Sequence, residues 1–404
     1  MLEQRFKSLK QIRSPELWPD IEGREPRPPR PEIPWGRLGT AALALAVAAA
    51  GVAFAYQAFR VDPVVPGEVQ PSPSVEPTPL SPLTGDPQIT AEIPLPKDSV
   101  EGGVAVGAGS AWVGIAHNGG KGPSSVLRID LSTNRVVDEI PVQQSPQRER
   151  IVATDDAVWI GSTGGIERID PSTNSVVARI DAPGFISAMA ADGTALWAIA
   201  ILDRSDSGLQ NTGTLLQIDP AANEVIAEIP LGTHATGYED ELELGSGSVW
   251  VLGPRLVDMD TEKGGDLIRV DPTTKEITAI IPVSGFSMAA GEDEMWVSGP
   301  VDGVNDESGE PWGVAVVDPA TDEVVRKAHF DHGLDIVTPE ALWSVDYDRN
   351  LNVRATRFDP ETLEVEARSD SIESYFTDAV VDPWTRTIWV SASDALVRMD
   401  ITAS

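Results

Sequence analysis

Cysteine is absent from the 404-residue chain, and histidine is scarce, with four residues. Without cysteine there is no disulfide, no thiolate metal site, no cysteine nucleophile and no lipid-modified cysteine anchor. The few histidines argue against a polyhistidine metal centre. Cationic residues are also in short supply, because 30 Lys+Arg face 63 Asp+Glu and leave a formal net charge of −33. A groove for a phosphate backbone needs the opposite sign, so nucleic-acid binding is excluded as the main task.

Long apolar runs are equally scarce, and only one is long enough to cross a bilayer. Residues 38–59 are 22 uncharged residues between Arg37 and Arg60, and about 20 apolar residues span the hydrocarbon core. Eight cationic residues precede this run, whereas only Arg60 and Lys97 follow it closely. The positive-inside rule therefore predicts a single-pass transmembrane helix, with the N-terminus in the cytoplasm and the rest extracytoplasmic. A cleaved signal peptide is the alternative, because Ala53-Phe54-Ala55 has the small-x-small form of a cleavage site.

The segments on either side of this helix are too irregular to form a packed core. Residues 1–37 form a predicted cytoplasmic tail, whose apolar residues 2, 6, 9 and 12 have helical spacing. This pattern allows a docking helix for a cytosolic partner, adsorption to the inner leaflet, or a frayed helix. Residues 60–87 form a predicted extracytoplasmic linker, with eight prolines in 62–87. In polyproline II geometry the linker would reach about 80 Å from the membrane.

Two internal repeats run in step through residues 88–404. One is a tryptophan between small or aliphatic residues, as in SAWVG and AVWIG, and the other is a segment such as VLRIDLSTNRVVDEI or IERIDPSTNSVVARI. Both occur seven times. The tryptophans are Trp112, Trp159, Trp197, Trp250, Trp296, Trp343 and Trp389. Their spacing of 38 to 53 residues is typical of one supersecondary unit per repeat.

Each unit contains four short alternating or β-branched runs separated by turn residues, which predicts four antiparallel strands. Four-stranded units at this period predict an all-β fold, a seven-bladed β-propeller. The seventh unit ends near Asp400 without a fourth strand, whereas QITAEIPL (88–95) precedes the first unit and matches a fourth strand. We therefore predict that the N-terminal strand completes the last blade and closes the ring.

The unit (A)WV…VLRID-x-STN-x-VV-x-x-IPV resembles the YVTN family of bacterial β-propeller repeats across residues 88–404. The resemblance implies seven blades and a binding or scaffold role without a fixed set of catalytic residues. Virginiamycin B lyase is a similar propeller with a Mg-dependent activity. None of the four histidines lies in a repeated motif, so no His/Glu catalytic pair is matched here.

The repeated residues are predicted to serve the fold. A buried tryptophan ring in every blade explains the repetition by packing alone. In the repeated Asp-Pro-x-Thr-Asn segments, proline presets the second turn position and aspartate accepts backbone hydrogen bonds, so a tight turn is expected rather than a metal site.

Function is expected on one face of the ring. Loops between the second and third strands vary in length and emerge on the same face as the connections between blades, whereas the other turns are uniformly short. Binding residues usually lie in loops held on a rigid scaffold. Donors and aromatic residues in the variable loops are therefore the candidate ligand-binding set: His117, Arg148, Arg150, Arg204, His234, Tyr238, Arg255, Trp312 and Arg349.

Two of these loops are acidic. Asp258, Asp260, Glu262 and Asp266 offer oxygen ligands at short spacing, and residues 302–307 hold a second such group. Oxygen ligands of this kind suit Ca²⁺. Neither loop has the fixed glycine or closing glutamate of an EF-hand loop, so ordinary acidic loops are the competing interpretation and no cofactor is otherwise expected.

These features predict a non-enzymatic, membrane-anchored extracytoplasmic propeller that binds a protein, glycan or small ligand in the cell envelope through one loop face. A divalent-cation-dependent lyase or hydrolase on the same face is one alternative. A transmembrane sensor that signals through residues 1–37 is the other.

Overall fold

The chain divides into two compact units, Met1–Pro79 and Leu80–Ser404. A computed structural model describes residues 85–97, 99–144, 150–202, 211–234, 240–253, 255–258, 261–263, 265–291, 293–301, 303–304, 312–330, 332–334, 336–338, 341–347, 352–374, 376–382, 385–392 and 394–401. The predicted tail (1–37), transmembrane helix (38–59) and most of the linker (60–87) lie outside these residues. Within the described part of the chain, no helix is long and apolar enough to cross a membrane.

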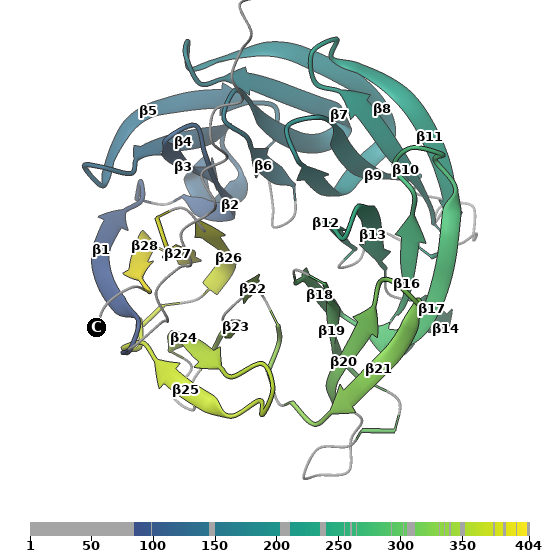
Figure 1. Cartoon of the computed structure of the whole chain (residues 1–404). Helices are drawn as coiled ribbons and strands as arrows, with labels where there is room; N and C mark the ends of the chain where they lie inside the picture. The colour runs from purple at the N-terminus through teal and green to yellow at the C-terminus, as the bar shows by residue number, and fades with distance from the viewer. Residues whose placement is uncertain are drawn as a thin grey trace, which may run out of the picture. The chain divides into compact units, whose positions relative to one another are not determined.

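Antiparallel β-sheets surround a common axis in the second unit (Figure 1). One sheet contains β2 (Val100–Gly107), β3 (Ser110–Ala116), β4 (Ser124–Asp130) and β5 (Arg135–Val142), with the short turn α4 (His117–Gly120) after β3. The next contains β6 (Ile151–Ala153), β7 (Val158–Asp170), β8 (Ser175–Ala191), β9 (Leu196–Leu202), β10 (Thr212–Asp219) and β11 (Glu224–Gly232). A third contains β12 (Glu241–Gly245), β13 (Ser248–Leu252), β16 (Gly265–Val270) and β17 (Ile277–Gly285). A separate ribbon of β14 (Arg255–Asp258) and β15 (Thr261–Lys263) lies between β13 and β16 in the chain.

Three further four-stranded sheets complete the ring. The first of them contains β18 (Ser287–Ala290), β19 (Met295–Gly299), β20 (Gly313–Asp318) and β21 (Glu323–Ala328). The second contains β22 (Ile336–Thr338), β23 (Ala341–Tyr347), β24 (Val353–Phe358) and β25 (Val365–Arg368). The third contains β26 (Phe376–Asp382), β27 (Thr387–Ala392), β28 (Ala395–Asp400) and β1 (Gln88–Pro94). In each sheet the first strand lies nearest the axis and the last lies on the rim, as β2 and β5 do in Figure 1. This arrangement confirms an all-β propeller.

The number of sheets differs from the predicted number of blades. Among the described residues, six sheets have four or more strands, whereas the sequence predicts seven blades. The difference lies in one sheet, which has six strands in the order β11-β10-β9-β8-β7-β6 and contains both Trp159 and Trp197.

The predicted closure of the ring is confirmed. Strand β1 pairs antiparallel with β28, with Gln88 opposite Asp400 and Pro94 opposite Ala395. The first described strand therefore lies on the rim of the sheet that contains the last strands of the chain. In Figure 1 the purple-blue β1 lies beside the yellow β28. Such a seam removes the free edge that β28 would otherwise expose.

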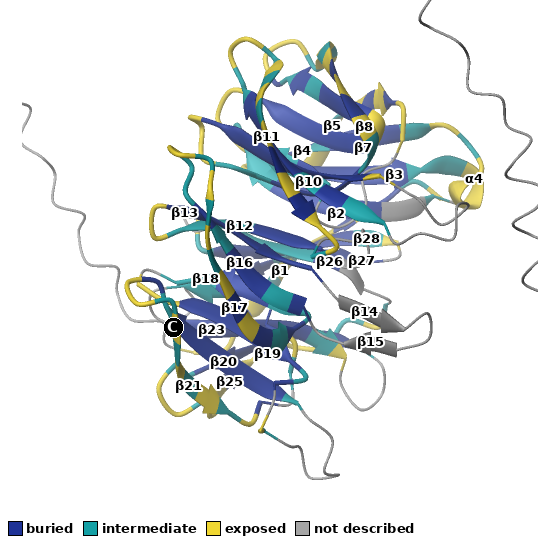
Figure 2. Ribbon diagram, turned by 90° about the vertical axis from the view of Figure 1, so that its right-hand side faces the viewer, coloured by how far each residue is buried: buried dark blue, intermediate teal, exposed yellow. Residues whose placement is uncertain are grey.

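The hydrophobic core lies in the middle strands of the sheets. All seven repeated tryptophans are buried, the most exposed being Trp296 at 3%. The outer strands alternate instead, as the pattern of exposed and partly buried residues in β11 shows. In Figure 2 the strand interiors are dark blue and the turns between strands are largely exposed. Neighbouring sheets therefore pack face to face over the tryptophans.

The turns after the third strands have the predicted tight geometry. In the turn at 170–174, Asp170 Oδ1 accepts the Ser172 N–H at 2.7 Å, and Asn174 has a φ of 50°. Asp130, Asp219, Asp271, Asp318 and Asp359 accept the backbone N–H two residues on in the same way. Asparagine tolerates the left-handed conformation better than most residues, which explains its place at the end of this turn.

Candidate functional site

The two faces of the ring carry different connections. One face carries the loops between second and third strands and the connections between successive sheets, and we call it the long-loop face. The opposite face carries the short turns, and we call it the tight-turn face. The turn α4 and the ribbon β14–β15 each lie between a second and a third strand in the chain, so by this definition both belong to the long-loop face. The tight-turn face includes the turns Gly107–Ser110 and Thr154–Ala157.

Two of the predicted ligand-binding residues on the long-loop face pair with carboxylates. His117 Nε2 lies 2.7 Å from Glu139 Oε1, and His234 Nδ1 lies 3.7 Å from Asp266 Oδ2. Each pair becomes an ion pair when its histidine is protonated. Asp266, a predicted metal ligand, is therefore placed beside a histidine.

Arg150 lies where three successive inner strands begin. It precedes β6, and its guanidinium carbon lies 5.4 Å from the ring centroid of Phe185 in β8. Burial lowers the pKa of Arg150, and the charge of Asp240, just before β12, opposes this shift. Asp240 is 2% exposed. The face of the Phe185 ring therefore contacts this guanidinium, and the negative charge of the buried Asp240 is close enough to favour its charged form.

Trp312 is the fourth predicted residue whose side chain is described. It follows the loop after β19, and its ring centroid lies 6.2 Å from that of Phe286, with the planes tilted by 40°. Phe185 and Phe286 occupy similar sequences, GFISAMAA and GFSMAA, at the start of an inner strand. The sequence analysis did not select these two residues or Asp240, although each immediately precedes or opens an inner strand.

The remaining predicted residues are not brought together by the described structure. Arg148, Arg204, Tyr238, Arg349 and Asp260 lie outside the described residues. Arg255 and Asp258 lie in β14 and Glu262 in β15, but their side chains are not described. Among the described residues, no three histidine or carboxylate side chains are grouped so that they could hold a metal ion.

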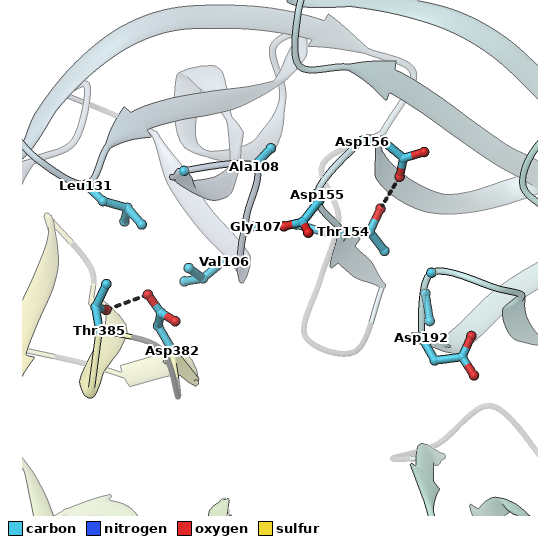
Figure 3. Close-up of a pocket in the computed structure, with 14 residues that line it drawn as sticks. Val106, Gly107, Ala108, Leu131, Thr154, Asp155, Asp156, Asp192, Asp382 and Thr385 are labelled. Carbon is cyan, nitrogen blue, oxygen red and sulfur yellow. Dashed lines mark hydrogen bonds between the residues drawn. The ribbon is translucent and has the colours of Figure 1, made fainter. Parts of the chain in front are cut away.

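A pocket of about 680 Å³ lies on the other side of the ring, among the turns of the tight-turn face (Figure 3). Turns that connect the first and second strands of the sheets supply most of its wall. The lining residues are Val106, Gly107, Ala108, Gly109, Leu131, Ala153, Thr154, Asp155, Asp156, Ala191, Asp192, Gly193, Asp382 and Thr385. A volume of this size is typical of small-ligand sites.

Four carboxylates give the pocket its chemistry. Asp155 and Asp156 follow β6, Asp192 follows β8 and Asp382 ends β26 (Figure 3). None of the described lining residues is cationic. A cleft lined by one sign of charge concentrates the field and attracts counter-charged ligands.

Local hydrogen bonds fix the orientation of these carboxylates. Asp156 Oδ1 accepts the Thr154 hydroxyl at 3.0 Å, and Asp382 Oδ2 accepts the Thr385 hydroxyl. Asp192 Oδ1 accepts the backbone N–H groups of Thr194 and Ala195 at 2.8 and 3.0 Å. Burial raises the pKa of Asp192, but these hydrogen bonds outweigh it and leave the pKa below its ordinary value. The Asp192 carboxylate is therefore charged at neutral pH.

The sequence predicts only uniformly short turns on this face and does not indicate a pocket there. An aspartate occurs in several of the short turns that follow inner strands, as in Asp155-Asp156, Asp192 and Asp382. The repeated aspartate in these turns could have indicated the pocket, but only with the knowledge that the inner strands converge on the axis of the ring.

No known family model matches this chain, and no curated protein matches it in sequence. Solved structures do resemble its fold. A chain of hydrazine synthase from Kuenenia stuttgartiensis matches with a TM-score of 0.54 and 12% identity over 73% of this chain and 94% of that one. The WD40 domain of Neurospora crassa Pan2 matches with a TM-score of 0.54 and 11% identity over 75% of this chain and 89% of that domain. These similarities support the β-propeller fold.

Proposed function

We propose that this protein is a non-enzymatic binding propeller, anchored in a membrane by residues 38–59 and carrying its ring on the extracytoplasmic side. The 22-residue uncharged run and the eight preceding cationic residues support the anchor and its orientation. The ring supplies a rigid scaffold, with loops and turns from many sheets grouped around one axis.

The pocket on the tight-turn face carries the binding part of the proposal. Its walls come from turns far apart in the sequence, and its four aspartates face one volume without a cationic residue among the described lining. A ligand with a cationic group would be attracted by the negative field of these carboxylates. The ligand class is therefore a cationic small molecule or a basic side chain of a protein partner.

Titration calorimetry tests the pocket, with the full chain in lipid nanodiscs and spermidine as the probe. The variant Asp155→Asn/Asp156→Asn/Asp192→Asn removes three charges while retaining acceptor oxygens. We expect its affinity for spermidine to fall by about tenfold, since exposed ion pairs contribute about 0.2–1 kcal/mol each. Binding to the unchanged protein should also weaken as salt is added.

A matched control removes three carboxylates elsewhere. Glu92, Glu224 and Glu228 are exposed on the outer strands β1 and β11, and the variant Glu92→Gln/Glu224→Gln/Glu228→Gln should bind spermidine nearly as well as the unchanged protein. Equal losses in the two variants would show that spermidine responds to net charge and not to the pocket.

We also propose that the ring contains seven blades, with the six-stranded sheet counting as two. Strand β8 pairs with β7 up to Phe185 and with β9 from Phe185 onward. Gly184 has a φ of 76°, and a Cβ there would lie 1.8 Å from the Ile201 carbonyl oxygen. The chain thus bends at Gly184, where the outer strand of one blade would continue into the inner strand of the next. An experimental density map with one uninterrupted sheet through Gly184 would contradict this division.

A further inference from the structure

We propose that the mouth of the ring on the long-loop face binds a neutral carbohydrate chain on a rim formed by Arg150, Phe185, Phe286 and Trp312. The proposal rests on the binding role proposed above, and it adds a second site with a different ligand class from the pocket on the tight-turn face.

Three of the rim residues lie at or near the start of an inner strand, and the fourth, Trp312, precedes β20 and contacts Phe286. Arg150 precedes β6, Phe185 lies where β8 turns toward the axis, and Phe286 precedes β18. Between them, Asp240 precedes β12, and the next residue, Glu241, accepts the backbone N–H of Met288 in β18 through Oε2. Figure 1 shows β6, β12 and β18 around the axis. The rim therefore consists of two contacting pairs, Arg150 with Phe185 and Phe286 with Trp312, and the start of β12 lies between them in the chain.

The aromatic residues of the rim are not required by the repeat. Each repeated tryptophan is at most 3% exposed, whereas Trp312 lies outside the repeat and is only partly buried, as are Phe185 and Phe286. Trp312 and Phe286 lie close enough to form one aromatic surface. Partly exposed aromatic residues supply large apolar contact areas and are common anchors of binding energy.

Arg150 supplies hydrogen-bond donors beside these rings. Its guanidinium carries five N–H donors in a fixed plane, and the side chain is partly exposed. Its guanidinium carbon lies 5.4 Å from the ring centroid of Phe185, which places these donors beside an aromatic face. The rim therefore presents flat apolar faces next to donors for oxygen acceptors.

Charge selects a neutral ligand for this rim. The formal net charge of −33 disfavours a polyanion, because the field of the whole molecule repels it. A cation would meet the guanidinium of Arg150, and a purely apolar ligand would leave that guanidinium desolvated without an acceptor. A sugar ring satisfies all three conditions, because it offers an apolar C–H face, many hydroxyl acceptors and no charge.

Titration of the full chain in lipid nanodiscs with maltohexaose, cellohexaose and chitohexaose tests the proposal. We expect at least one of these probes to bind. Trp312→Ala should weaken that probe by about tenfold, or about 1.4 kcal/mol, and Trp312→Phe should recover part of the loss. Arg150→Gln should also weaken binding, whereas Glu228→Gln, exposed on the outer strand β11, should leave it unchanged. Thermal unfolding of each variant separates a binding loss from a folding loss.

Three outcomes would overturn the proposal. If none of the three oligosaccharides binds while spermidine still binds, the carbohydrate site is wrong and the proposed function stands. If an oligosaccharide binds equally to Trp312→Ala, Arg150→Gln and the unchanged protein, the site lies elsewhere. If a neutral tyrosine- and proline-rich decapeptide binds in a Trp312-dependent manner and the oligosaccharides do not, the rim is a peptide site.

Discussion

Arginine residues in four of the repeats join one repeat to the next. Arg128 in β4 stacks over Trp112 of its own sheet, with 5.0 Å between the guanidinium carbon and the ring centroid. The same side chain donates to Asn174 Oδ1 in the turn of the following repeat, at 2.6 Å. Arg168, Arg269 and Arg398 repeat this arrangement with Asn223, Asp322 and Asn134. Each tie combines a cation–π contact with a charge-assisted hydrogen bond, so it stabilises the packing between neighbouring repeats.

One tie has its donor and acceptor exchanged. Gln217 occupies the arginine position in β10, and Lys275 occupies the asparagine position in the next turn, where its Nζ donates to Gln217 Oε1. We expect Gln217→Arg alone to lower the free energy of unfolding by about 1 kcal/mol, because the new guanidinium faces Lys275. Adding Lys275→Asn should restore that stability, since it recreates the pair found in the other repeats.

Thermal unfolding of the two single variants and the double variant measures this coupling. Lys275→Asn alone removes the donor to Gln217 and should cost less than Gln217→Arg alone. A double variant no more stable than Gln217→Arg would show that the two positions do not act as a pair.

The turn aspartates predict a specific response to acid. Hydrogen bonds from Ser172 and Thr173 hold the pKa of Asp170 below its ordinary value of 3.8, and similar bonds lower the pKa values of Asp130 and Asp219. A lowered folded-state pKa adds stability above the unfolded-state value, and this stability is lost as the pH falls through the folded-state value. The variant Asp130→Asn/Asp170→Asn/Asp219→Asn should therefore melt below the unchanged protein at neutral pH, and this difference in melting temperature should narrow as the pH falls below the ordinary pKa of 3.8. A difference of constant size would mean that the charge of these aspartates does not stabilise the turns.

At the scale of single elements, β1 has the largest consequence for the ring. It pairs with β28 along its length, and Ile93 and Leu95 at its end are buried at 4% and 7% exposure. Deleting residues 88–95 should expose the edge of β28 and remove apolar burial worth at least about 3 kcal/mol. We expect aggregation or a large fall in melting temperature, measured by light scattering during thermal unfolding.

A milder variant separates the pairing of β1 from its side chains. Ile93→Ala/Leu95→Ala keeps the strand but removes its buried side chains, so its melting temperature should fall between those of the unchanged protein and the deletion. An unchanged melting temperature in the deletion variant would show that the ring closes without β1.

At the scale of the whole molecule, charge is distributed unequally along the chain. Residues 1–37 carry eight cationic and six acidic side chains, whereas residues 38–404 carry 22 cationic and 57 acidic ones. The positive-inside rule therefore favours a cytoplasmic N-terminus with the ring outside. Protease added to intact cells should digest the chain after residue 59 and spare a tag at Met1. Protection of the ring under these conditions, with digestion only after lysis, would contradict the proposed orientation.

The sequence by itself determined the repeat, the turns and the closing strand. Trp112 and its six counterparts, the Asp-Pro-x-Thr-Asn turns and the fourth-strand pattern of residues 88–95 are local patterns. The structure that each pattern predicts depends only on spacing and on the chemistry of a few adjacent residues. It can therefore be predicted without knowing which sheets pack against each other. Arg150 and Trp312 were also selected from the sequence, because they lie in variable loops.

Only the tertiary structure decided which distant residues share a site. Asp156 and Asp382 are separated by 226 positions in the sequence, yet both line one pocket because the inner strands of their sheets converge on the axis. Arg150 meets Phe185 and Asp240 for the same reason. Arg398 reaches Asn134 only because β1 closes the ring beside β28. At each of these positions the local sequence predicts only an ordinary turn or the end of a strand. It does not predict which distant residue will lie opposite once the ring has closed.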